Sequence, residues 1–460
     1  MLRLRYGRML VDGLDGEHGL PRARLAELAR RFGSVRDDVR ERRGAGEYGF
    51  LRLPDQAETV RQISQFAGGL GQAFDHVLVL GIGGSALGTK ALVSALRPPA
   101  WNELNDEQRD FYPRLTVLEN VDPWTVRGAL ERIDPRRVLV NVVSKSGGTA
   151  ETLAQYLVVR SWLEGALGSG VQRHLVFTTD PDRGALREIA TREGIATLAV
   201  PPEVGGRFSV LSPVGLLPAA LVGIDVVALL AGAARAVRSG GESDLLKNPA
   251  AFYAALHWAA DTGLGVRVHV LMPYADRLRE FVEWYRQLWA ESLGKRVDRR
   301  GQTVHVGPTP VGAIGATDQH SQVQLFMEGP YDKAVTFIAV SDAGPDVLIP
   351  ARNGLPPDLA YLPGHSLGQL LGAEQQATSG ALARAGRMHC TLEVPNLTAE
   401  SFGELLMFFQ IATGFAGAWY GIDPFDQPGV ELGKKLTYAA MGREGFAEEA
   451  PAPKDPGDVA

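Results

Sequence analysis

The stretch His76-Val-Leu-Val-Leu-Gly-Ile-Gly-Gly-Ser-Ala-Leu-Gly88 decides the fold class of this chain. It starts with an apolar run, passes through a glycine-rich turn and continues into a helical pattern. Apolar residues at successive positions, instead of alternate ones, are typical of a strand that helices cover on both faces. The stretch therefore predicts a strand, a loop and a helix of a parallel α/β sheet.

The same pattern of apolar runs separated by helical segments recurs along most of the chain. A first region predicts further strands at residues 115–119, 138–143, 174–178 and 196–200. After a helical pattern at residues 248–261, a second region predicts strands at residues 266–272, 303–306, 334–340 and 388–394. Two regions of similar size predict an α/β fold with two parallel-sheet domains, each with helices on both sides of its sheet.

Helical patterns flank these regions, at residues 21–31 and 56–66 before them and at about 398–420 and 429–441 after them. The predicted organisation is a helical arm (1–65), a first α/β domain (66–240), a second α/β domain (241–397), C-terminal helices (398–445) and a tail (446–460). The acidic, proline-rich composition of the tail predicts disorder. Residues 213–234 are largely apolar, but Pro218, Gly223 and Asp225 interrupt them, so they predict buried helices and no membrane span.

The composition excludes several classes of protein. Of 460 residues, 45% are hydrophobic and 22% are charged, as in ordinary globular proteins. The formal net charge of −6 gives no electrostatic reason to bind nucleic acid or an anionic membrane. The single cysteine, Cys390, cannot form an internal disulfide, and the first residues lack the apolar core of a signal peptide. We therefore expect a cytoplasmic protein.

The glycine-rich loop at residues 81–88 has the features of a ligand-binding loop. Glycines let a ligand approach the backbone, the following helix turns unpaired N–H groups toward it, and Ser85 adds a hydroxyl. Gly81, Gly83 and Ala86 also match the dinucleotide fingerprint, which is typical of NAD-dependent oxidoreductases. That fingerprint requires an acidic residue about 20 positions on. The nearest candidate, Glu119, lies well beyond that distance.

A second polar loop, Ser144-Lys-Ser-Gly-Gly-Thr-Ala-Glu-Thr152, follows the strand predicted at residues 138–143. Its hydroxyls can donate to a phosphate, the ammonium of Lys145 can neutralise charge, and the dipole of the following helix assists. The alternative is a turn in which a Ser or Thr caps that helix. Because both loops lie at the carboxyl ends of parallel strands, where α/β sheets bind ligands, together they favour a phosphate site.

A helical pattern that stops at Gly294 carries Gln287 and Glu291 four positions apart, on one face. Large apolar residues surround that face. A carboxylate that is held still and partly shielded from water can act as a general base. The alternative is an acid on the protein surface near a helix end.

Six motifs occur in the order found in phosphoglucose isomerases: Gly81-Ile-Gly-Gly-Ser85, Ser144-Lys-Ser-Gly-Gly-Thr149, Gly205-Gly-Arg-Phe-Ser209, Gln287-x-x-x-Glu291-Ser-x-Gly-Lys295, Gln319-His320 and Gln427-Pro-Gly-Val-Glu-Leu-Gly-Lys434. The chain therefore resembles the phosphoglucose isomerase family over about residues 75–436, and the last motif is close to diagnostic. The resemblance implies two sugar-isomerase (SIS) domains of the flavodoxin-like type, in a three-layer αβα arrangement. It also implies reversible conversion of glucose 6-phosphate to fructose 6-phosphate through a cis-enediolate, without metal or cofactor.

The resemblance assigns roles to the matching positions. Glu291 would move the proton between C1 and C2, and Arg207 would stabilise the enediolate. The ring-opening residues would be His320 and Lys434. The sugar would contact Gln287 and Gln427, and the phosphate would be bound by Gly84, Ser85, Ser144, Lys145, Ser146 and Thr149. In the family the histidine comes from the neighbouring subunit, so the resemblance implies a homodimer in which His320 crosses the interface.

The chain departs from the family pattern in the second loop, where Gly147 and Gly148 replace further threonines and Ser146 replaces a frequent threonine. Three hypotheses remain: a sugar-phosphate isomerase, an NAD-dependent oxidoreductase, and a non-catalytic SIS module that senses a sugar phosphate. Activity toward mannose 6-phosphate stays open, because contacts at C2 decide it. Neither a His-Glu-x-x-His motif nor a cysteine pair indicates a metal site.

Overall fold

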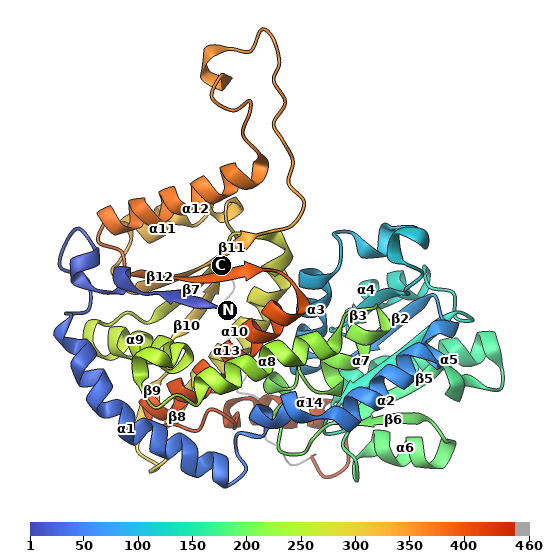
Figure 1. Cartoon of the computed structure of the whole chain (residues 1–460). Coiled ribbons are helices and arrows are strands. Elements are labelled where there is room, and N and C mark those ends of the chain that lie inside the picture. The colour runs from blue at the N-terminus through green and yellow to red at the C-terminus, as the bar shows by residue number, and fades with distance from the viewer. Residues whose placement is uncertain (447–460) are drawn as a thin grey trace, which may run out of the picture.

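The first predicted region forms a five-stranded parallel sheet in the computed structural model, which describes residues 1–446 (Figure 1). The strand order is β3-β2-β4-β5-β6, with β3 Arg114–Leu118, β2 His76–Leu80, β4 Val138–Ser144, β5 Leu175–Thr179 and β6 Ala196–Ala199. Four helices follow successive strands: α3 Leu87–Leu96, α4 Pro123–Leu130, α5 Ala150–Leu167 and α6 Ala185–Glu193. All five strands predicted in this region are confirmed.

Helices cover both faces of this sheet, which explains its unbroken apolar runs. In β2, Val77 and Val79 belong to one hydrophobic cluster, which also contains residues of α3. The intervening Leu78 and Leu80 belong to another cluster, which contains residues of α5. Alternate residues of one strand therefore meet different helical layers, and every position of the strand needs an apolar side chain.

The second region forms another five-stranded sheet, ordered β1-β12-β11-β7-β10. Its strands are β1 Arg3–Arg5, β12 His389–Asn396, β11 Lys333–Asp342, β7 Val268–Pro273 and β10 Thr309–Gly312; β1 is antiparallel to β12 and the other pairs are parallel. The sequence pattern did not predict β1 or β10. Both are short edge strands, β1 lies in the arm expected to be helical, and Pro310 breaks the apolar run of β10.

One predicted strand of the second region lies outside this sheet. Residues 303–306 do form a strand, β9 Thr303–Val306, but it pairs with β8 Lys295–Val297 in a separate antiparallel ribbon. A short run of alternating residues predicts a strand but carries no information about its partner.

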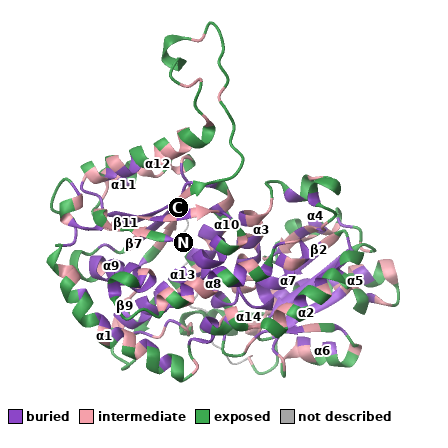
Figure 2. Cartoon of the chain, in the orientation of Figure 1, coloured by how far each residue is buried: buried purple, intermediate pink, exposed green. Residues whose placement is uncertain are grey.

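Long apolar helices lie between the two sheets (Figure 1). The central one, α13 Ala399–Tyr420, is buried at every position from 401 to 419, and it packs against α8 Val226–Gly240, α9 Pro249–Leu264 and α10 Arg279–Leu293 (Figure 2). Glycines bring α8 and α13 into backbone contact. A Cβ added at Gly232 would lie 1.7 Å from the carbonyl oxygen of Glu400, and one at Gly403 would lie 1.9 Å from that of Leu229. This approach therefore requires glycine on both helices.

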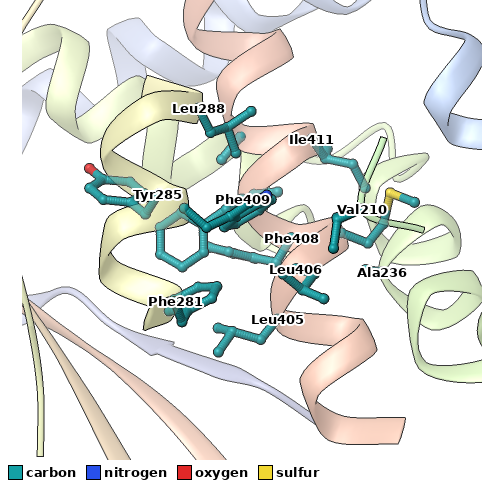
Figure 3. Close-up of a cluster of buried hydrophobic side chains, with 14 of the residues drawn as sticks. Val210, Ala236, Phe281, Tyr285, Leu288, Leu405, Leu406, Phe408, Phe409 and Ile411 are labelled. Carbon is teal, nitrogen blue, oxygen red and sulfur yellow. The ribbon is translucent and has the colours of Figure 1, made fainter. Parts of the chain in front are cut away.

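The helix α10 is anchored to α13 by aromatic side chains (Figure 3). The ring of Phe409 lies 5.1 Å from that of Tyr285 and 5.6 Å from that of Phe281, measured between centroids. All three side chains are fully buried or nearly so. One face of α10 is therefore fixed in the core, and the opposite face is available for a site.

The remaining α-helices are α1 Ala23–Gly44, α2 Ala57–Gly68, α7 Pro213–Leu221, α11 Val323–Glu328, α12 Leu367–Arg384 and α14 Glu431–Ala440. α1 is longer than predicted, because its polar second half still buries Val35 and Val39. The apolar residues 213–234 form α7 and the first part of α8, with the break at residues 222–225. Within residues 1–446, no helix combines the length and apolarity needed to cross a membrane.

The segment between β11 and α12, residues 343–366, projects away from the rest of the chain (Figure 1). We call it the projecting arm. A bridge between Leu348 and Ser366 holds its base, and its apolar side chains Val347, Leu348, Leu359 and Tyr361 are exposed. The tail predicted to be disordered lies outside the described residues from position 447 on.

Candidate active site

The two polar loops lie side by side at the carboxyl edge of the first sheet. β2 and β4 are paired in parallel, with Leu80 opposite Val142, and β4 ends only two residues further on, so the loops that follow these strands are neighbours. The first loop contains the short helix η5 Gly83–Ser85 and places Ser85 half-buried. The predicted meeting of the two loops at one edge is confirmed.

Glycines in the first loop are needed for contact with other parts of the site. Gly83 has φ of +57°, and a Cβ there would lie 2.8 Å from Nε2 of Gln287 on α10. A Cβ at Gly84 would lie 2.3 Å from the carbonyl oxygen of Gly206, which begins the short helix η9 Gly206–Phe208. The loop is therefore packed between α10 and the segment that carries Arg207. A side chain at Gly84 would separate the loop from that segment, and at Gly83 the positive φ favours glycine.

The second loop gathers three hydroxyls at the start of α5. Ser144 Oγ lies 3.0 Å from Thr149 Oγ1, and Ser146 Oγ lies 3.4 Å from the same atom. Gly147 turns the chain with φ of +63°. Within the described chain no side chain caps the amino end of α5, so the capped-turn alternative is wrong. The first N–H groups of the helix can therefore bind an anion.

Lys145 is held against the opposite wall of this loop. Its Nζ donates to the carbonyl oxygens of Pro202 at 2.7 Å and Val204 at 2.9 Å. Burial lowers the pKa of this ammonium. An ammonium has three donors, so one remains for an anion.

The carboxylate of Glu291 lies between a cation and an amide. Arg207 Nη1 donates to its Oε1 at 3.2 Å, and Gln287 Nε2 donates to its Oε2 at 3.0 Å. The Glu291 side chain is 27% exposed and that of Arg207 only 2%. The surface-acid alternative is therefore wrong: this carboxylate is half-buried and ion-paired, and one side of it remains accessible.

Arg207 uses its whole guanidinium to join three segments. Besides Glu291, it donates to Ser292 Oγ at 2.7 Å and to Gln427 Oε1 at 2.9 Å. Its Nη2 donates to the carbonyl oxygens of Pro424 at 2.5 Å and Asp426 at 3.0 Å. Burial lowers the pKa of Arg207, and the charge of Glu291 opposes that shift. The guanidinium keeps a fixed position beside the carboxylate, as a charge-stabilising donor requires.

Lys295, which sequence reasoning placed in a motif without a role, also belongs to this cluster. Its Nζ donates to the carbonyl oxygens of Glu291 and Asp426, both at 2.9 Å. The signal in the sequence is a lysine directly after the glycine that ends a helix, since cations often bind the last carbonyls of helices. The contact with Asp426, 131 residues away, has no local signal.

Two predicted site residues are not joined to this cluster. His320 is exposed and follows the short helix η12 Thr317–Gln319. Lys434 is exposed on α14, where its Nζ pairs with Glu431 Oε1 at 2.7 Å. In the described part of the chain, no hydrogen bond or ion pair connects either residue to Glu291 or Arg207.

The geometry disfavours the dinucleotide alternative. Glu119, the acid nearest to the position that the fingerprint requires, is paired with Lys90 Nζ at 2.6 Å. Gly83 and Gly84 are already in contact with protein groups, as described above. Residues 1–446 contain no group of three or more His, Cys, Asp or Glu side chains arranged to hold a metal ion.

Comparisons with known proteins agree with this arrangement. The family model described as phosphoglucose isomerase matches residues 50–446. A protein of Carboxydothermus hydrogenoformans named glucose-6-phosphate isomerase is 45% identical over 449 residues, which cover 97% of this chain and 96% of the relative. One of Rubrobacter xylanophilus with the same name is 47% identical, covering 94% and 97%. The crystal structure of a glucose-6-phosphate isomerase from Chlamydia trachomatis superposes with a TM-score of 0.72 at 26% identity, covering 84% of this chain and 73% of that one.

Proposed function

Since this chain belongs to the phosphoglucose isomerase family, we propose that it interconverts glucose 6-phosphate and fructose 6-phosphate with Glu291 as the proton-transferring group. The reaction serves glycolysis and, in reverse, gluconeogenesis. The observation that carries the residue assignment is the carboxylate of Glu291, held between the buried Arg207 and Gln287 with one side accessible. Neither the oxidoreductase nor the sensing module is supported.

The phosphate of the substrate binds between the two loops. Ser144, Ser146 and Thr149 donate hydroxyl protons, Lys145 supplies the free proton of its ammonium, and the open N–H groups of α5 add their dipole. Gly84 and Ser85 close the site from the neighbouring loop. The phosphate group does not react, so its binding energy serves to orient the sugar.

Proton transfer takes place on the open-chain sugar. The carboxylate of Glu291 removes the hydrogen from C2, which leaves a cis-enediolate, and then delivers a proton to C1. The proton of the C2 hydroxyl passes to O1, so that C2 becomes the carbonyl carbon of the ketose. The developing oxyanion lies beside the fixed charge of Arg207. Gln287 and Gln427, whose amide groups already bind Glu291 and Arg207, orient the hydroxyls of the sugar.

Ring opening precedes this step, because it requires an acid at the ring oxygen and a base at the anomeric hydroxyl. We assign it to Lys434 and to His320 of a second copy of the chain. Both side chains are exposed, so they are free to reach the sugar from outside the Glu291 cluster. The projecting arm, which exposes Val347, Leu348, Leu359 and Tyr361, offers a surface to the second copy that this homodimer requires.

The domain boundaries remain part of the proposal. We propose domains at residues 66–240 and 241–397, with C-terminal helices at 398–445 that complete the site through Gln427. The two sheets support this division, except that β1 of the second sheet comes from the N-terminal arm. We also propose that the enzyme works in the cytoplasm, where phosphorylated sugars are metabolised.

The test is direct. Purified protein is incubated with glucose 6-phosphate alone, without nicotinamide, and fructose 6-phosphate is measured after quenching. We expect conversion to equilibrium, and in heavy water we expect product that acquires solvent deuterium on long incubation. The absence of any fructose 6-phosphate contradicts the activity; conversion without deuterium at full reversibility contradicts the carboxylate relay. A parallel incubation with mannose 6-phosphate tests whether the enzyme distinguishes between sugars that differ in the configuration at C2.

A further inference from the structure

The ammonium of Lys295 lies at the point where the end of α10 meets the segment of residues 423–427. Its Nζ donates to the main-chain oxygen of Glu291 and to that of Asp426, both at 2.9 Å, and lies 3.4 Å from Oδ1 of Asp426. The side chain is only 6% exposed. Every one of its partners therefore belongs either to the residue that moves the proton or to the segment that carries Gln427.

The contact with Glu291 solves a problem at the end of the helix. The last carbonyl groups of an α-helix have no amide partner in the next turn. α10 ends at Leu293, and the amide of Gly294 binds the carbonyl oxygen of Ala290. The carbonyl oxygen of Glu291 is next in line, and the Lys295 ammonium takes the place of the missing amide. This contact restrains the backbone of Glu291 itself, three bonds from the Cβ atom of the side chain that carries the carboxylate.

Burial of this ammonium costs free energy, so packing alone does not explain its position. Burial lowers the pKa of Lys295, and the nearby positive charge of Arg207 lowers it further. Two cations in one small volume repel each other. They share an acceptor, since the Asp426 carbonyl oxygen binds Lys295 Nζ at 2.9 Å and Arg207 Nη2 at 3.0 Å. Arg207 then binds the Glu291 carboxylate, so the two cations hold the same residue by its backbone and by its side chain.

We propose that Lys295 is a positioning residue that fixes the backbone of Glu291 relative to Arg207 and residues 423–427, and so sets the direction of the proton-transferring carboxylate. The inference rests on the proposed function. Among residues 1–446 no hydrogen bond or ion pair joins Lys295 to the loops that bind phosphate, so its removal should affect the chemical step and leave substrate binding nearly unchanged. A displacement of about 1 Å at a reacting group can lower a rate by about 100-fold.

The chain offers a matched control in Arg42 on α1. Arg42 is another buried cation, 7% exposed, that binds the same segment through Asp423 at 2.9 Å. Its hydrogen bonds go to Glu47 and Asp423, and within residues 1–446 none goes to α10. Lys295→Met and Arg42→Met therefore remove comparable buried charges from one segment, but only the first removes a contact with Glu291.

The experiment compares these variants with the wild type in the isomerase assay, using protein from a host that lacks its own isomerase. We expect Lys295→Met to lower kcat by about 10- to 100-fold and to keep KM within about threefold of the wild-type value. Arg42→Met should keep kcat within about twofold of the wild-type value, although the melting temperature of both variants falls. In a Glu291→Gln background, Lys295→Met should change the residual kcat by less than about threefold, because the group it positions is gone. Lys295→Arg, which keeps the positive charge, should have a kcat between those of Lys295→Met and the wild type.

Several outcomes overturn the proposal. They are an equal loss of kcat in Lys295→Met and Arg42→Met, a rise in KM without a loss of kcat, and a full additional loss in the Glu291→Gln background. An inactive wild type refutes the proposed function instead, and it is measured first, so the two failures are distinguishable.

Discussion

Replacement of Glu291 by Gln is the sharpest perturbation of the site, because the structure can accommodate the amide with little rearrangement. The new Oε1 can still accept from Arg207 Nη1, which lies 3.2 Å from the present carboxylate oxygen. The new Nε2 would replace the present Oε2, which accepts from Gln287 Nε2 at 3.0 Å. Two N–H donors would then face each other. The Oε1 of Gln287 is buried and without a hydrogen-bond partner among the described residues. Rotation of the Gln287 amide by half a turn restores a donor–acceptor pair.

What the variant loses is the proton acceptor and one negative charge. Loss of a general acid/base typically costs about 10²- to 10⁴-fold in rate, which corresponds to about 3 to 5 kcal/mol in the activation free energy. Among the described residues no hydrogen bond or ion pair joins the loop at residues 144–149 to Glu291, so we expect the affinity for sugar phosphates to change by less than about tenfold. Turnover is measured by the coupled assay, and affinity by titration with a non-reacting sugar phosphate. If affinity and turnover fell by the same factor, Glu291 would have a structural role and the proton would move through another group.

The other predictions concern the phosphate loop, the glycine contact and acid stability. Lys145→Ala should raise KM by about 10- to 100-fold, the value of one charged hydrogen bond, with kcat within about threefold; a fall in kcat at constant KM would contradict phosphate binding. Gly84→Ala should lower kcat/KM by more than about tenfold, since its Cβ has no room, whereas Gly128→Ala, with nothing within 4 Å, should be neutral. Burial lowers the pKa of His257 to about 3 and that of His389 to about 4. The unfolded chain, with a histidine pKa near 6.5, binds more protons below that pH. As the pH falls from about 6 to 5, the free energy of unfolding should therefore fall by about 1 kcal/mol per histidine. Urea unfolding at two pH values measures it, and a slope that His257→Gln leaves unchanged would refute the assignment to that residue.

Local patterns predicted most of the regular structure and the ligand loops. The strands of the first sheet were predictable because both of their faces are buried, so each residue of β2 carries the signal. The spacing of Gln287 and Glu291 predicted a shared helical face, and their hydrogen bond confirms it. The edge strands β1 and β10 were missed, because an edge strand needs fewer apolar residues and tolerates proline.

The sequence by itself determined most of the strands and helices and the two loops, because the residues that produce each of them are neighbours along the chain. The environment of Glu291 depends on contacts that no local window contains. Arg207 reaches Glu291 across 84 positions and Gln427 across 220, and without the motif resemblance it reads as an ordinary surface arginine. Burial distinguishes Arg207 from a surface arginine. A guanidinium removed from water must bind oxygen atoms of the protein, and the fold determines which oxygen atoms lie close enough. The packing of α13 against α10 brings these oxygens together, and so the pairing of cation and carboxylate is a property of the folded chain.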